Sequence, residues 1–132
     1  MSLSEENRCI IVGREIDKAM QNYEQAELLR EHEYWDAAAN RLYYAVLHAV
    51  NSLLIHDKHE VKTHHGVGML FRQKYIKTGI LTERFSDTFT LLQTMREKSD
   101  YNCSFDATRG LIDPLFSPTK EMIDTIAGMV KE

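Results

Sequence analysis

An arginine, a tyrosine and a histidine share one face of a strongly apolar segment in the first half of the chain. Arg41 and His48 are seven residues apart, with Tyr44 between them. In a helix, that spacing places them about 20° apart around the axis and about 10 Å apart along it. A guanidinium binds phosphate oxygens through paired hydrogen bonds, and an imidazole transfers protons near neutral pH. The spacing therefore indicates a candidate phosphate-binding stripe.

A structural role for the same residues stays open. An arginine within an apolar helix needs a partner, which a carboxylate from the first or fourth expected helix would supply. His48 would then be a hydrogen-bonded histidine of the core.

A second group of polar residues follows later in the chain. Arg96 and Asp100 have the four-residue spacing of a helical ion pair, which when exposed contributes only about a few tenths of a kcal/mol. In a functional interpretation, Arg96 and Tyr101 contact the phosphate and the base of a nucleotide, and Asp100 orients the arginine. In the alternative, Tyr101 packs against the second helix.

Four histidines surround a polar segment near the middle of the chain, and they raise the question of zinc. They are His56, His59, His64 and His65. The segment has no nearby cysteine and lacks the tight paired spacing of zinc ligands, so a solvated loop is the preferred interpretation. We expect no metal site and no cofactor.

Helical periodicity dominates the chain, because apolar residues recur at spacings of three and four. It predicts helices over residues 3–31, 34–55 and 63–77, a fourth helix after Thr82, and a last helical segment over residues 106–131. The fourth helix should fray near residues 100–103. Pro114 and Pro118 should split or bend the last segment. The expected fold class is all-α, an antiparallel bundle of four to five helices.

Three residues carry signals for the ends of these helices. Ser2 and Glu5 have the spacing of a capping box for the first helix. Gly79 suits the left-handed position after the third helix.

Length and composition favour one globular domain over residues 1–132. The chain has 43% apolar and 27% charged residues, and a formal net charge of −4. That charge argues against strong sequence-independent binding to nucleic acid. We find neither a signal-peptide pattern nor an apolar run of roughly 20 residues, and so expect a cytoplasmic protein that does not enter a membrane. Cys9 and Cys103 are expected to be reduced thiols that pack as small apolar residues.

Two stretches of sequence carry a family signal. Residues 38–49 read AANRLYYAVLHA, similar to the AAxRxYYAxxHA helix of small bacterial and archaeal HEPN proteins. Residues 96–101 read REKSDY, similar to the RxxxDY element of the same subgroup. Between them, residues 62–66, Phe71 and residues 77–79 fit that subgroup's H-x-G … F … TG stretch. The chain therefore resembles the HEPN family from about residue 10 to residue 130.

The resemblance implies a helical bundle that commonly forms homodimers, often beside a small nucleotidyltransferase partner. Some family members are toxins that cut RNA without a metal, using an arginine followed four to six residues later by a histidine. Others bind nucleotides or act as scaffolds. In this chain all six histidines lie at or before residue 65, and Asp100 and Tyr101 stand where the nuclease histidine would fall.

Two functional hypotheses follow. In the first, the protein is a module that binds a nucleotide or a partner through Arg41, Tyr44, Asp100 and Tyr101. It would then be the partner of a small nucleotidyltransferase in a toxin–antitoxin-like pair. In the second, it is a metal-independent endoribonuclease toxin that binds RNA, with His48 as the general base and Arg96 or Arg41 as the stabilising cation. The missing histidine after Arg96 favours the first hypothesis.

Overall fold

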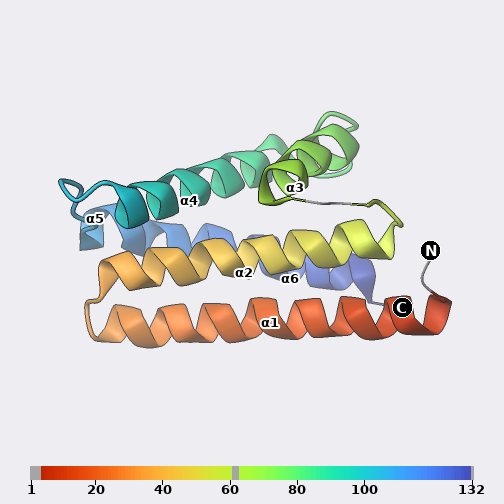
Figure 1. The fold of residues 1–132 in the computed structure, drawn as a ribbon, viewed down its shortest axis with the longest axis horizontal. Helices are drawn as coiled ribbons and strands as arrows, with labels where there is room; N and C mark the ends of the chain where they lie inside the picture. The colour runs from red at the N-terminus through yellow and green to blue at the C-terminus, as the bar shows by residue number, and fades with distance from the viewer. Residues whose placement is uncertain (1–3, 61–62, 132) are drawn as a thin grey trace.

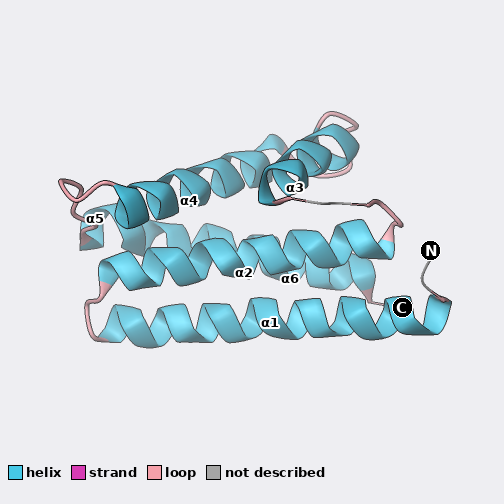
Figure 2. Cartoon of the chain, viewed as in Figure 1, coloured by secondary structure: helices cyan, strands magenta, loops and turns pink. Residues whose placement is uncertain are grey.

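The structure, a computed structural model, describes residues 4–60 and 63–131 of the 132-residue chain. All the regular elements within these residues are helical (Figures 1 and 2). They are α1 (Glu5–Glu31), α2 (Trp35–His56), α3 (His64–Phe71), a π-helical turn η1 (Arg72–Ile76), α4 (Glu83–Tyr101), α5 (Arg109–Ile112), a 3₁₀ turn η2 (Asp113–Leu115) and α6 (Phe116–Val130).

The four long helices run alternately in opposite directions. Helix α2 occupies the centre and packs against α1, α4 and α6, with α6 behind it in the view of Figure 1. With α3, the described residues form five helices of eight residues or more, and α5 adds a single turn. The predicted fold class, an all-α antiparallel bundle, is confirmed.

Helix α2 is central because it is apolar on almost every side. Twelve of its 22 residues are buried, more than a helix with one buried face would show. Four of the twelve are alanines, whose small side chains allow neighbouring helices to approach closely. Helix α1 instead buries one stripe, in which Val12, Ala19, Tyr23 and Ala26 follow the predicted spacing. The apolar pattern thus places α2 in the core and α1 beside it.

A cluster of aromatic rings joins α2 to the later helices. Phe89 of α4 lies with its ring centre 6.1 Å from that of Tyr43 and 6.0 Å from that of Phe71. Tyr75 continues the cluster, 6.1 Å from Phe71. It belongs to the π-helical turn, where the periodicity predicted an ordinary α-helix. A π-helical turn is rare, and it occurs mostly as a single turn within an α-helix, frequently at a functional site.

The ends of the helices follow the sequence in part. Helix α1 is capped by Ser4, whose Oγ accepts a 3.1 Å hydrogen bond from the Asn7 amide, and the expected cap Ser2 lies outside the described residues. Thr82 is at the cap position of α4, although its side chain makes no capping hydrogen bond. Gly79 has a φ of 81°, as its predicted position after the third helix requires.

The last third of the chain is divided as its prolines predict. Helix α4 ends at Tyr101, and the segment after it forms α5, the 3₁₀ turn and α6 in place of one helix. One prediction about packing was wrong, because Cys9 and Cys103 are both exposed free thiols. Cys9 lines the same hollow as Val12 and Ile16, so spacing placed it on the right face, but it stays exposed there.

Candidate functional site

Two amide side chains hold Arg41. Its Nη1 donates a 2.7 Å hydrogen bond to Asn22 Oδ1 on α1, and its Nε and Nη2 donate to Asn40 Oδ1 at 3.1 and 2.6 Å. The sequence led us to expect a carboxylate partner from the first or the fourth helix, and the partner from α1 is an amide. An amide carries no charge, so the guanidinium is fixed in place while keeping its full positive charge.

Asn22 is itself held from both sides. It is 8% exposed, and its Nδ2 donates a 2.8 Å hydrogen bond to the Lys18 carbonyl while its oxygen accepts from Arg41. The sequence analysis missed this residue. Asn22 lies three residues after Ala19 and four before Ala26, both fully buried. A polar residue at a position of the buried stripe was the signal that could have identified it.

Arg96 of α4 lies against the tyrosines of α2. Its Cζ is 4.9 Å from the ring centre of Tyr43 and 5.9 Å from that of Tyr44, both within cation–π range. Its Nη1 donates a 3.2 Å hydrogen bond to Asp100 Oδ2, so the predicted helical ion pair is present. The arginine side chain is only 15% exposed, so this ion pair is less exposed to solvent than a pair on the helix surface would be.

Arg96 keeps its positive charge although its side chain is mostly buried. Burial lowers the pKa of Arg96, but its interactions with Tyr44, Tyr43, Tyr101 and Asp100 raise it by more, so the pKa lies above its usual value. This arginine is therefore a permanent cation.

Tyr44 links the two arginines. Its ring centre lies 5.2 Å from the Arg41 guanidinium and 5.9 Å from that of Arg96, so one ring contacts cations from α2 and α4. Tyr43 beside it is fully buried, and burial raises the pKa of its hydroxyl. The two rings meet edge to face, 5.1 Å apart. The segments 38–49 and 96–101, recognised separately in the sequence, thus meet in space.

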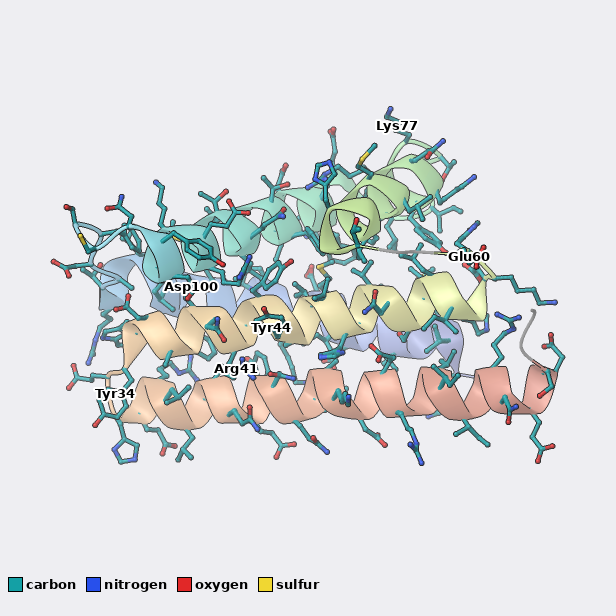
Figure 3. The ribbon with its side chains drawn as sticks, viewed as in Figure 1. Tyr34, Arg41, Tyr44, Glu60, Lys77 and Asp100 are labelled. Carbon is teal, nitrogen blue, oxygen red and sulfur yellow. The ribbon has the colours of Figure 1, made fainter. Side chains whose placement is uncertain are left out.

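Two hollows flank this meeting point. One of about 330 Å³ is lined by Arg41, Asn40, Ser99 and Asp100, together with residues from the start of α2 and the end of α1. The other, of about 460 Å³, is lined by Arg96, Tyr101 and their neighbours at the end of α4. In Figure 3, Arg41, Tyr44 and Asp100 lie along one face of the bundle, where the end of α4 passes α2. Tyr101 is 80% exposed, so its ring is available to a ligand and does not pack against α2.

Three buried polar atoms near the hollows have no hydrogen-bond partner among the described residues. They are Tyr43 Oη, Arg96 Nε and Ser99 Oγ. Native proteins rarely leave such atoms unpaired, and water or a ligand usually satisfies them. The α2–α4 contact therefore has unused hydrogen-bonding capacity next to two cations.

His48 has a different environment. Its Nδ1 is 2.8 Å from Glu15 Oε2 on α1, and the two side chains are 22% and 19% exposed. His48 lies about two helical turns from Arg41 and lines neither hollow. The structure thus brings Arg41, Tyr44, Arg96, Asp100 and Tyr101 together and places His48 apart from them.

A family model described as "HEPN domain" matches residues 13–129. This chain belongs to the HEPN family. It is 30% identical over 91 residues to "Putative toxin MJ0142" of Methanocaldococcus jannaschii, an alignment that covers 69% of this chain and 62% of that protein. It is 26% identical over 117 residues to "Putative toxin MJ0605" of the same organism, covering 89% of this chain and 87% of that protein. A "UPF0332 protein" of Thermotoga maritima is 29% identical over 84 residues, with 64% of each chain covered.

The HEPN match covers all the residues of the α2–α4 site. The alignments to the first and third of these relatives span less than two thirds of the relatives' own lengths. Within residues 4–60 and 63–131, no helix is both long enough and apolar enough to cross a bilayer. Nor do three histidine, cysteine, aspartate or glutamate side chains of these residues come together as a metal site would need, and nothing is described for the side chain of His64.

Proposed function

We propose that this HEPN protein is a nucleotide- and partner-binding module, acting in a toxin–antitoxin-like pair with a small nucleotidyltransferase. The observation that carries the proposal is the pair of guanidinium groups, Arg41 and Arg96, that share the ring of Tyr44 beside two hollows. The names of two relatives, both putative toxins, support the toxin-like setting. The family resemblance supports the choice of partner.

Each part of the site has a role in binding a nucleotide. Arg41, held by neutral amides, attracts a phosphate without an internal carboxylate competing at its own hydrogen bonds. Arg96 lies against Tyr43 and Tyr44 and supplies a second cation. Tyr101 offers an exposed ring on which a base stacks, an interaction of about 1–3 kcal/mol per base. Asp100 fixes the orientation of Arg96.

Calorimetric titration with ATP and AMP tests this proposal. Arg41→Gln and Arg96→Gln should each weaken binding at least about tenfold, because a hydrogen bond to a charged group contributes about 1.5–3 kcal/mol. Arg84→Gln is the matched control. Arg84 is on α4 too, but it forms an exposed ion pair with Glu121 and lines neither hollow. Equal binding by all three variants, or none by the wild type, would rule out the site.

The same proposal includes a homodimer located in the cytoplasm. The family resemblance supports the dimer, and the two exposed free thiols suit a reducing compartment. Sedimentation velocity over a range of concentrations measures the oligomeric state. Co-purification from the native cell, followed by mass spectrometry, measures whether a small nucleotidyltransferase accompanies the protein. A monomer without such a companion would contradict this part of the proposal.

A metal-independent endoribonuclease is the second candidate, and the contact between His48 and Glu15 favours it. A carboxylate on Nδ1 orients the imidazole, so that its opposite nitrogen can serve as the acceptor that a general base requires. Cleavage of RNA in the presence of EDTA, lost in both His48→Ala and Arg96→Ala, would establish this activity. Wild-type protein that is folded and leaves RNA intact would leave the binding module as the function.

A further inference from the structure

A third hollow lies at the other end of the bundle, between the first half of α1 and the end of α6. Its volume is about 830 Å³, larger than either hollow at the arginine site. It is lined by Arg8, Val12, Gly13 and Ile16 of α1, and by Ala127 and Val130 of α6. In Figure 1 the start of α1 and the end of α6 lie at the same end of the bundle. The HEPN match begins at residue 13 and ends at residue 129, so part of this wall lies outside the family core.

The wall of this hollow is long and mostly apolar. Val12, Ile16, Ala127 and Val130 supply its apolar surface. From Arg8 to Ile16, α1 rises by about 12 Å, at roughly 1.5 Å per residue. A Cβ placed on Gly13 would meet no atom within 4 Å, so the hollow is open directly above the backbone of α1. Its volume falls within the range of small-molecule sites, about 300–1,000 Å³, and such sites often lie between the helices of bundles.

A buried cation lies at one end of this apolar wall. The Arg8 side chain is 13% exposed, and its Nη1 donates a 2.9 Å hydrogen bond to the Ile55 carbonyl at the end of α2. Its Nε is buried and has no hydrogen-bond partner among the described residues. The carboxylate of Glu5 is 3.7 Å from this Nε, beyond hydrogen-bonding distance, and its side chain is 75% exposed. Arg8 lines the hollow, so its guanidinium offers positive charge to an acidic group that enters there.

We propose that this hollow binds an amphiphilic carboxylate, a molecule with an apolar chain and one acidic head group. The carboxylate pairs with the guanidinium of Arg8 at the wall of the hollow, a pairing that guanidinium geometry suits well. Lys131, which also lines the hollow, adds positive charge. The apolar chain extends along Val12 and Ile16 toward Asp17. This site is separate from the α2–α4 site and does not depend on the function proposed for it.

Calorimetric titration with decanoate, below the concentration at which it forms micelles, tests this site. Saturable binding with one decanoate per chain is expected, and decanol should bind at least about tenfold more weakly because it lacks the charge. Arg8→Gln should weaken decanoate binding by a similar factor. No saturable binding to the wild type, or equal binding of decanoate and decanol, would overturn the proposal.

A second variant separates loss of the site from loss of the fold, since Arg8 also binds the end of α2. Gly13→Leu projects a side chain into the open hollow and improves helix propensity, so it should abolish binding without lowering the melting temperature. Gly128→Leu is the matched control, because Gly128 of α6 has equally open space and does not line the hollow. Unchanged binding in Gly13→Leu, or equal loss in Gly128→Leu, would refute the site.

The two thiols provide an independent measurement. Cys9 lines the hollow, whereas Cys103 lies after α4, and both are exposed. Decanoate should slow the alkylation of Cys9 by iodoacetamide, read by mass spectrometry of the two peptides, and leave Cys103 unaffected. Equal protection of both thiols, or of neither, would count against binding at this position. Protection of Cys9 alone, lost in Gly13→Leu, is the result that the proposal requires.

Discussion

Asn22 of α1 accepts a 2.7 Å hydrogen bond from Arg41 of α2, and this contact fixes the arginine in place without neutralising its positive charge. A buried amide orients the guanidinium as firmly as a carboxylate would, but does not neutralise it. The contact also connects the two helices at the height of the candidate site. Arg41 thus has the hydrogen-bond partner that a partly buried side chain needs, and its positive charge stays available to a ligand.

Asn22→Asp should therefore weaken nucleotide binding while keeping the fold. The new carboxylate would pair with Arg41 and cancel its charge, so we expect the affinity for ATP to fall about tenfold, or about 1.4 kcal/mol. Calorimetry measures the affinity, and circular dichroism checks the helix content. Asn22→Leu is the companion variant. It leaves a partly buried guanidinium without its α1 partner and should cost about 1–3 kcal/mol of stability in urea unfolding. Unchanged affinity in Asn22→Asp would mean that the charge of Arg41 has no role in binding.

Tyr43→Phe should leave the folding stability of the protein unchanged or raise it by about 1 kcal/mol. The hydroxyl that this change removes is buried and has no hydrogen-bond partner among the described residues. Folding therefore removes its hydrogen bonds to water and supplies none within the protein. The midpoint of urea unfolding, with the slope checked for constancy, measures the effect. A loss of more than about 1 kcal/mol would instead show that an ordered water or a ligand satisfies this oxygen.

Gly68→Ala should destabilise the protein by about 1–3 kcal/mol. A Cβ at Gly68 would lie 3.1 Å from Arg72 Nη1 and 3.3 Å from Phe89 Cε1, closer than ordinary packing allows. Arg72 has little freedom to move away, since it is hydrogen-bonded to Ser86 and Thr90 on α4. Gly13→Ala is the control in open space and should stabilise α1 by up to about 1 kcal/mol. The melting temperatures of the two variants should therefore shift in opposite directions, and shifts of the same sign would contradict the packing argument.

Stability should fall at alkaline pH, with Tyr75 as one cause. Burial raises the pKa of Tyr75, and its hydrogen bond to Asp57 raises it further. The unfolded chain releases this proton near pH 10, whereas the folded chain retains it. The stabilisation is thus complete below about pH 10 and is lost as the pH rises further, by at most about 1.4 kcal/mol per pH unit for this group. Urea unfolding between about pH 9 and 11 should show a shallower decline in Tyr75→Phe than in the wild type. Parallel declines would exclude this tyrosine as a cause.

The order of the helices could be predicted from the sequence because each apolar stripe is long and regular. Helix α2 was recognisable as the central element from its lack of a polar face, and Pro114 and Pro118 marked the division of the last segment. The π-helical turn at Arg72–Ile76 was not predictable, since it depends on how Tyr75 reaches Asp57 and Phe71 rather than on local propensity. The exposure of Cys9 was missed for a related reason. Spacing gives the direction of a side chain, but not how far the neighbouring helix extends over it.

The candidate site was predictable in its parts but not in its connections. Arg41 and Arg96 stood out as charged residues in apolar or motif-bearing segments. Their shared contact with Tyr44 depends on the crossing of α2 and α4, which no spacing within either helix specifies. The partner of Arg41 was expected on the first or the fourth helix, and the first holds it, but as an amide and not as the carboxylate that usually pairs with a buried cation. The separation of His48 from the hollows was likewise not predictable, because it depends on the contact of His48 with Glu15 of α1.

The central position of α2 limits how this protein can change during evolution. Arg41 and Tyr44 are carried by the helix that also packs against α1, α4 and α6, so substitutions along it alter the core and the site at once. The outer helix α4 carries no such double role at Tyr101, whose ring is exposed. New ligand preferences should therefore arise through the end of α4. Across related chains, sequence diversity at the site should concentrate there, while α2 changes slowly.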